Sequence, residues 1–216
     1  MKKVPFFLSL SLIIFVTILL SSIIIYISLS NSNSQNYSEL VDQMQNVNNS
    51  LVEMNTNYGT IYIELFLEES PITAGNFKKL IEDGFYDGIL FHRIIEGFVI
   101  QGGDPNTKNE SLRNRWGTGG PGYVIEDEFV EGLSNTKWTL SMANSGPNSG
   151  GSQFFINLND NTNLDFDKEP LASKHPVFGK VISGFEVIEQ IAQVETQRGD
   201  VPVEDVEIES ALVVYN

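Results

Sequence analysis

The 216-residue sequence predicts a mainly β domain, a β-barrel or β-sandwich, preceded by one N-terminal transmembrane helix. Many short strand-like runs, punctuated by Gly, Asn and Pro, follow residue 50, and only two helical patterns interrupt them. One helical pattern comes early and the other late, which favours a closed barrel plugged at both ends. Residues 5–30 contain no charged side chain, which predicts the membrane helix.

Residues 1–30 have the properties of an uncleaved membrane anchor. About 24 helical residues span roughly 36 Å, more than the ~30 Å hydrocarbon core of a bilayer. The run exceeds the ~7–15 apolar residues of a signal peptide, and "IIIYISLS" offers no clean cleavage site. Lys2 and Lys3 precede it, so we expect a single-pass cell-membrane protein with its domain on the extracytoplasmic side. A cleaved signal peptide and a buried core helix are the alternatives.

Residues 31–50 are polar and rich in Asn, which predicts a linker. Tyr37, Leu40, Met44 and Val47 follow one another at spacings of three and four, so a short coiled-coil stalk is the alternative. A coiled coil needs about three to four heptads and barely two are present. The folded domain is therefore expected at residues 51–216.

Two strands and a helix open this domain. The run "LVEMNTNYGTIYIELF" gives two strands around an Asn-Tyr-Gly turn, because its apolar residues alternate with polar ones. In "SPITAGNFKKLIEDGFYDG", Ser70 is a plausible N-cap, Pro71 suits the first helical position and Gly84 suits the end. A helix is therefore expected between Ser70 and Gly84.

The remainder of the domain is expected to be mostly strands. Five runs have strand character: "ILFHRII", "FVIQ", "WTLSMA", "QFFINL" and "HPVFGKVI". A second helix is predicted in "GFEVIEQIAQVE", where Val187, Ile188 and Ile191 share one face. The chain closes with another strand in "VEDVEIESALVVY".

The composition excludes several classes of function. The chain has no cysteine, which rules out disulfides, thiol catalysis and cysteine-based zinc sites. The net charge is −15, and after Lys2 and Lys3 the chain has 11 basic and 28 acidic residues. No nucleic-acid partner is expected, because phosphate contacts need clustered Lys and Arg.

Three segments resemble catalytic or metal-binding motifs but lack essential residues. The Gly-rich run "NSGPNSGGSQFF" lacks the Lys-Ser/Thr of a phosphate-binding loop. The Gly151-Ser152 pair is not part of the Gly-x-Ser-x-Gly turn of a serine hydrolase. The acidic run "DNTNLDFDKE" lacks the Gly and Glu of a calcium loop. The sequence therefore predicts neither a metal nor a cofactor.

Four phrases point to a family. In order along the chain they are "FHRIIEGFVIQGGDP", "GTGGPGYVIEDEF", "LSMANSGPNSGGSQFFI" and "HPVFGKV". With them the chain resembles the cyclophilin family of peptidyl-prolyl cis-trans isomerases from about Leu51 to Val214. The resemblance implies a closed eight-stranded antiparallel β-barrel capped by two helices, and proline-containing polypeptides as substrates.

The resemblance also implies an active site. Arg93 matches the catalytic arginine of the family, whereas His92 before it is expected to be structural. The other matched positions belong to the substrate groove: Phe98 and Val99 on the floor of the proline pocket, Gln101 on the substrate backbone, Ala143 and Asn144 at the backbone-binding edge, Gln153 and Phe155 on the next strand, Leu164 on the pocket wall, and His175 at the rim.

The chemistry of prolyl isomerisation suits these residue types. Rotation about an X-Pro bond meets a barrier of ~18–20 kcal/mol but breaks no bond, so no nucleophile, metal or cofactor is required. The guanidinium of Arg93 stays charged and can donate to the prolyl nitrogen as that atom gains a lone pair. We expect an isomerase that assists folding outside the membrane; a proline-peptide binding module or holdase with little turnover, or a structural surface protein, is the alternative.

The chain departs from the family pattern at three places. Asn163 stands where the family often has Trp, so only weak binding of cyclosporin is expected. Nine residues, "FDKEPLASK", separate Asp165 from His175, where compact members have about two. Trp138 stands where the family usually has Gly before the "LSMAN" strand.

Overall fold

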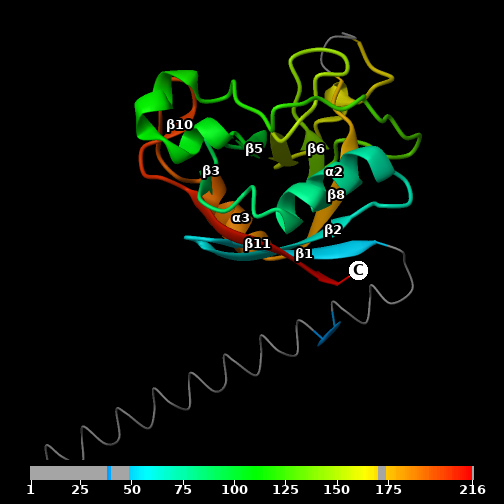
Figure 1. Cartoon of the computed structure of the whole chain (residues 1–216), viewed down its shortest axis with the longest axis horizontal. Coiled ribbons are helices and arrows are strands. Elements are labelled where there is room, and N and C mark those ends of the chain that lie inside the picture. Colours follow the sequence, from blue (N-terminus) through cyan, green and yellow to red (C-terminus); the bar gives the residue numbers. More distant parts are fainter. Residues whose placement is uncertain (1–37, 40–48, 170–173, 216) are drawn as a thin grey trace, which may run out of the picture. The chain divides into compact units, whose positions relative to one another are not determined.

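The computed structural model describes residues 38–39, 49–169 and 174–215. The predicted anchor at residues 1–30 lies outside the described residues, as does most of the linker at 31–50. Within the described parts of the chain, no helix is long and apolar enough to cross a membrane. The domain forms one compact unit, Val47–Asn216 (Figure 1).

The start of the domain lies slightly earlier than the sequence predicted. Asn49 and Ser50, assigned to the linker, are buried. The Asn49 amide donates to the Glu64 carboxylate at 2.9 Å and accepts from the Leu67 N–H at 3.1 Å. These bonds tie Asn49 to the folded domain.

Strands dominate the domain. They are β1 (Ser50–Thr56), β2 (Gly59–Leu65), β3 (Ile89–Leu90), β4 (Arg93–Ile95), β5 (Val99–Gly102), β6 (Thr139–Met142), β7 (Phe154–Asn157), β8 (Val177–Ser183), β9 (Thr196–Gln197), β10 (Val201–Pro202) and β11 (Glu207–Tyr215). The helices are α2 (Pro71–Glu82) and α3 (Phe185–Ala192), with 3₁₀ helices η1 (Pro105–Lys108), η2 (Glu110–Arg115) and η3 (Thr162–Leu164). The sequence missed the 3₁₀ helices and the β9–β10 hairpin.

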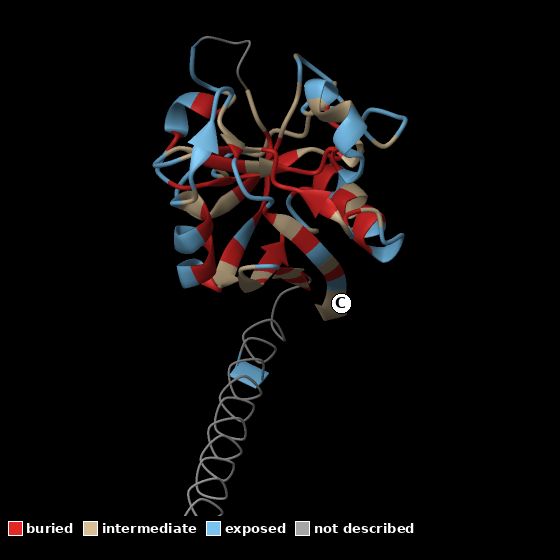
Figure 2. Cartoon of the chain, turned by 90° about the vertical axis from the view of Figure 1, so that its left-hand side faces the viewer, coloured by how far each residue is buried: buried red, intermediate tan, exposed pale blue. Residues whose placement is uncertain are grey.

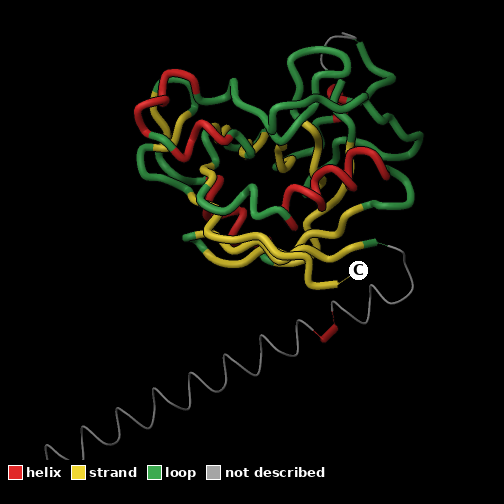
Figure 3. Tube along the Cα trace, in the orientation of Figure 1, coloured by secondary structure: helices red, strands yellow, loops and turns green. Residues whose placement is uncertain are grey.

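Nine strands form one curled antiparallel sheet in the order β3-β11-β1-β2-β8-β6-β7-β5-β4. Figure 3 shows the strands in yellow and the helices in red. The prediction of a closed eight-stranded barrel is therefore wrong: within the described residues β3 and β4, the two ends of this order, do not pair. Strands β3 and β4 follow each other in the chain. Backbone groups at this point form hydrogen bonds with residues nearer the C-terminus. Phe91 N–H donates to the Val206 carbonyl and Ile94 N–H to the Asp200 carbonyl, both at 2.8 Å.

Helix α2 is capped by a carboxylate from a distant loop. Ser70 is the N-cap as predicted, but its hydroxyl donates to Glu128 at 3.0 Å instead of accepting from the helix. The Glu128 carboxylate accepts the backbone N–H groups of Ile72 at 3.1 Å and Thr73 at 2.8 Å. It satisfies two of the helix's free donors and suits the positive end of the helix dipole.

The core is built around an aromatic cluster. The Phe77 ring from α2 lies 4.9 Å from Tyr86, 5.0 Å from Phe154 and 5.1 Å from Phe178, between ring centroids. All four side chains are fully buried, and Figure 2 shows the buried residues gathered in the middle of the domain. Helix α2 packs on β8 and β11, and α3 packs on β2 and β5, so the helices cover the core.

Trp138 has a backbone conformation that glycine adopts far more readily than other residues. Its φ is +75°, in the left-handed region that L-residues other than Gly rarely adopt. Its ring lies 5.2 Å from the Phe185 ring, and the Lys137 ammonium lies 4.2 Å above it. Packing and a cation–π contact therefore offset backbone strain just before β6.

His92 lies in the core between β3 and β4, in keeping with its expected structural role. Its side chain is 5% exposed, and burial lowers the pKa of the imidazole to about 4. The neighbouring Asp104 carboxylate opposes this shift but does not reverse it. His92 is therefore neutral in the folded domain at pH 7.

Replacing Trp138 separates its strain from its packing. Trp138→Gly and Trp138→Ala both lose the ring contacts, but only Gly relieves the left-handed backbone. We expect the Gly variant to be more stable than the Ala variant by about 1 kcal/mol, measured by urea denaturation. An Ala variant as stable as the Gly variant would show that the backbone here is unstrained.

His92 makes stability depend on pH. Its pKa is about 4 folded against 6.5 unfolded, so the unfolded chain binds more protons between these values. Stability should fall as pH drops through this window, by about 2 kcal/mol between pH 7 and pH 4.5 from this group alone. His92→Gln should lower stability at pH 7 and reduce the pH slope by that amount in denaturant titrations. An unchanged slope contradicts a buried neutral imidazole.

Candidate active site

The structure brings nine of the ten predicted site residues to one cavity of about 240 Å³. They come from β4, β5, β7 and the loops beside them. The lining residues are Arg93, Phe98, Val99, Gln101, Ala143, Asn144, Phe155, Leu164 and His175. The tenth, Gln153, lines an adjoining cavity of about 230 Å³ that shares Gln101, Ala143 and Asn144 with the first.

Strand alternation explains how polar and apolar residues share these strands. Arg93 on β4 lies opposite Gln101 on β5, and Gln101 lies opposite Phe155 on β7. The intervening Ile100 and Phe154 point to the main core, because successive side chains of a strand face opposite sides. One row of cross-strand neighbours thus faces the cavity.

A chain of hydrogen bonds links Arg93 to a distant loop. Arg93 Nη1 donates to Gln101 Oε1 at 3.4 Å, and Gln101 Nε2 donates to Gln153 Oε1 at 3.1 Å. Gln153 Nε2 donates in turn to the Gly119 carbonyl at 2.8 Å. A carbonyl only accepts, so Gly119 fixes the orientation of both amides and leaves the Gln101 oxygen facing the guanidinium.

Arg93 has a second partner that the sequence did not suggest. Its Nε lies 3.5 Å from the Asp200 carboxylate, and the two side chains are 40% and 48% exposed. The guanidinium is therefore reachable from solvent while held from two sides. The only sequence signal for Asp200 was the composition of "RGD", which indicates a turn and not a site.

The apolar part of the cavity is a small cluster distinct from the main core. Val99, Phe155 and Leu164 are each less than 10% exposed, and Phe98 and Ala143 pack against them. Because these side chains come from β5, β7 and the loops around them, their positions follow from the sheet. The cluster offers a preformed apolar surface.

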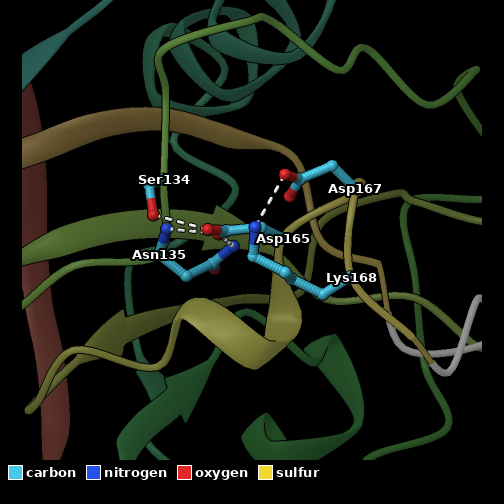
Figure 4. Close-up of polar contacts among 5 residues, drawn as sticks. All are labelled: Ser134, Asn135, Asp165, Asp167 and Lys168. Carbon is cyan, nitrogen blue, oxygen red and sulfur yellow. Dashed lines mark hydrogen bonds and ion pairs between the residues drawn. The ribbon is translucent and has the colours of Figure 1, made fainter.

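The pocket wall at Leu164 is anchored by the next residue. Asp165 accepts hydrogen bonds from Ser134 Oγ at 2.5 Å and from Asn135 N and Nδ2 at 2.7 and 2.8 Å (Figure 4). The Lys168 ammonium pairs with Asp167, while the Lys168 backbone N–H donates to the Asp165 carbonyl at 3.1 Å. The sequence missed the anchoring role of Asp165, because Ser134 and Asn135 lie 31 and 30 residues away in the chain.

The ends of the insertion between Asp165 and His175 are held together. The His175 N–H donates to the Leu164 carbonyl at 3.0 Å. The Asn144 amide donates to the Lys174 carbonyl at 2.8 Å. The insertion therefore leaves the two cavity residues that flank it in place, and the Asn144 side chain serves the loop.

His175 has one ring nitrogen whose protonation is fixed by its partner. Its Nδ1 lies 3.0 Å from the Met142 carbonyl, which can only accept, so Nδ1 carries the proton. Burial lowers the pKa of the imidazole below its ordinary value. The ring meets Phe155 edge-on with centroids 5.2 Å apart, so it extends the apolar surface toward the rim.

Asn163, where the family often has Trp, lies in η3 beside Leu164 and is exposed. Its short side chain is not among those lining the cavity. The residues that line the cavity therefore include no indole at this edge, and the weak binding of cyclosporin stays a prediction.

Comparisons with known proteins agree with this geometry. The model of the family described as "Cyclophilin type peptidyl-prolyl cis-trans isomerase/CLD" matches residues 51–213. Peptidyl-prolyl cis-trans isomerase ppi1 of Schizosaccharomyces pombe is 42% identical over 164 residues, covering 76% of this chain and 98% of that protein. A peptidyl-prolyl cis-trans isomerase of Acinetobacter baylyi is 44% identical over 151 residues, covering 68% and 74%.

Solved structures show the same fold. A cyclophilin type peptidyl-prolyl cis-trans isomerase of Cryptosporidium parvum superposes with a TM-score of 0.67 and 32% identity, covering 78% of this chain and 99% of that one. A second structure of that protein, in the presence of the dipeptide Ala-Pro, gives a TM-score of 0.66. This chain belongs to the cyclophilin-type peptidyl-prolyl cis-trans isomerase family.

Proposed function

We propose that this enzyme rotates X-Pro bonds of proline-containing polypeptides on the extracytoplasmic side of a membrane, with Arg93 as its catalytic residue. The observation that carries the proposal is the composition of one cavity. Its floor and wall are apolar, and a single guanidinium stands at its side. A proline ring and the amide nitrogen next to it need this combination.

The apolar cluster holds the proline ring. Val99, Phe155 and Leu164 present a rigid surface already packed before substrate arrives. The ring gains by leaving water, and its position places the prolyl nitrogen beside Arg93. Binding alone does not accelerate the rotation, because substrate and transition state would gain equally.

Arg93 supplies the interaction that is stronger in the transition state. In the planar amide the nitrogen lone pair is delocalised and accepts poorly; in the twisted amide it is localised and accepts well. A guanidinium N–H donates to it at any physiological pH. Arg93 is 40% exposed in the free protein, and a bound substrate covers it and thereby strengthens the hydrogen bond.

One flank of the substrate must be held while the other rotates. The backbone N–H and C=O of Asn144 make no hydrogen bond to another described residue, so both groups can pair with the backbone of a peptide. Gln101, fixed by Gln153 and Arg93, adds a second polar contact. The other part of the substrate, which extends beyond the open side of the cavity, rotates about the X-Pro bond.

The membrane location rests on the sequence alone. The uncharged run at residues 5–30 follows Lys2 and Lys3, which favours a single-pass anchor with the domain outside. The acidic domain suits an exposed, soluble surface. There the enzyme acts on chains that fold after they cross the membrane.

Arg93 is tested by substitution in the full-length chain kept in detergent. Arg93→Ala should lower kcat and kcat/KM together by about 10²–10³-fold in a protease-coupled assay on a Pro-containing peptide. Arg93→Lys should restore little, because an ammonium lacks the planar fork. Lys79→Ala, on the exposed face of α2, is the control for loss of a positive charge. Near-normal turnover of Arg93→Ala overturns the proposal, and peptide binding by a wild-type chain without turnover favours a binding module or holdase.

The topology is tested on intact cells that express the chain with a C-terminal epitope. Added protease should remove the epitope without lysis, and the chain should stay in the membrane fraction after a carbonate wash. A domain that is protected until the cells are lysed contradicts the orientation. A domain found in the medium indicates a cleaved signal peptide.

A further inference from the structure

We infer that Asp200 is a positioning residue that holds the guanidinium of Arg93 in its working orientation. The inference rests on the proposed role of Arg93. It goes beyond that role because Asp200 belongs to the β9–β10 hairpin, which contributes nothing to the lining of the cavity.

Two contacts on different nitrogens fix the plane of the guanidinium. Asp200 Oδ2 lies 3.5 Å from Nε, and Gln101 Oε1 lies 3.4 Å from Nη1. One contact would let the group turn about that contact, whereas two hold its plane. Nη2 has no partner among the described residues, so it remains for the substrate.

Asp200 is itself fixed by its backbone. Its carbonyl accepts the N–H of Ile94, the residue after Arg93, at 2.8 Å, and its N–H donates to the Gln197 carbonyl at 3.0 Å. The hairpin is therefore hydrogen-bonded to β4 at Ile94, the residue next to Arg93. This bond constrains the position from which the Asp200 carboxylate approaches the guanidinium.

The conformation of Asp200 carries a backbone cost. Its φ is +62°, in the left-handed region, directly after Gly199 at +89°. Asp tolerates this region better than most residues, but Gly would adopt it without cost. If position 200 only had to form a turn, Gly would be sufficient. The presence of an Asp side chain therefore indicates a role in addition to the turn.

The ion pair does little for stability. Both side chains are about half exposed, and such pairs contribute little to folding. Its effect on turnover is different in kind, because a displacement of about 1 Å at a reacting centre can cost ~10²-fold in rate. Removing Asp200 should therefore slow turnover without unfolding the domain.

The experiment is a double-mutant cycle in the full-length chain. Asp200→Asn keeps the shape and the left-handed backbone, and Asp200→Gly removes the side chain. Relative to wild type, we expect kcat to fall about 3–10-fold for Asn and about 10–30-fold for Gly, with KM nearly unchanged, below the ~10²-fold cost of a full 1 Å displacement. In an Arg93→Ala background neither change should lower the residual rate further.

Glu204→Gln is the matched control, because it removes one negative charge from an exposed site just beyond the hairpin. It should leave kcat unchanged. Melting temperatures of the Asp200 variants should stay within a few degrees of wild type, which separates positioning from a structural role. The Nε–H resonance of Arg93 should shift in the Asp200 variants and not in Glu204→Gln.

The outcomes separate the two claims. If Arg93→Ala lowers turnover but Asp200→Asn and Asp200→Gly do not, the positioning role is wrong and the proposed function stands. If the Asp200 changes slow the Arg93→Ala enzyme as much as wild type, Asp200 acts independently of Arg93 and the inference fails. If Arg93→Ala itself keeps normal turnover, the proposed function fails first.

Discussion

The alternation of side chains along β4, β5 and β7 is the constraint on which the site depends. Each of these strands has one face on the main core and the other on the cavity. Phe154 packs on Phe77 while Phe155 faces the cavity. A shift of one residue in register would bury Arg93 and expose Ile94. The packing of the core therefore also sets the positions of the catalytic groups.

Polar contacts then fix the orientations of side chains and loops that the strands do not determine. The Gly119 carbonyl orients Gln153 and Gln101, and the Asp165 network holds the loop that carries Leu164. The insertion is joined at its ends by the bond from His175 to Leu164. Since little must move when the substrate arrives, little binding energy is lost to ordering the protein.

The sequence predicted the features that depend on local patterns and on family motifs. Strand and helix periodicities located most elements, and the family phrases led to nine residues that share one cavity. It did not predict contacts between remote segments, such as the Glu128 cap on α2 or the approach of Asp200 to Arg93. Those depend on how the sheet curls. Closure of the barrel was mispredicted for the same reason, since the C-terminal segment takes the hydrogen bonds at the β3–β4 seam.

The most direct test of the central claim measures isomerisation on the enzyme itself. NMR exchange spectroscopy at saturating peptide gives the rate of cis–trans interconversion in the bound state, and a titration on the same sample gives the peptide Kd. If Arg93 acts on the twisted amide, its removal should slow bound-state exchange by about 10²-fold or more while Kd changes only a few-fold. A rate that falls only in proportion to affinity would contradict the account, because Arg93 would then contribute to binding and not to rotation.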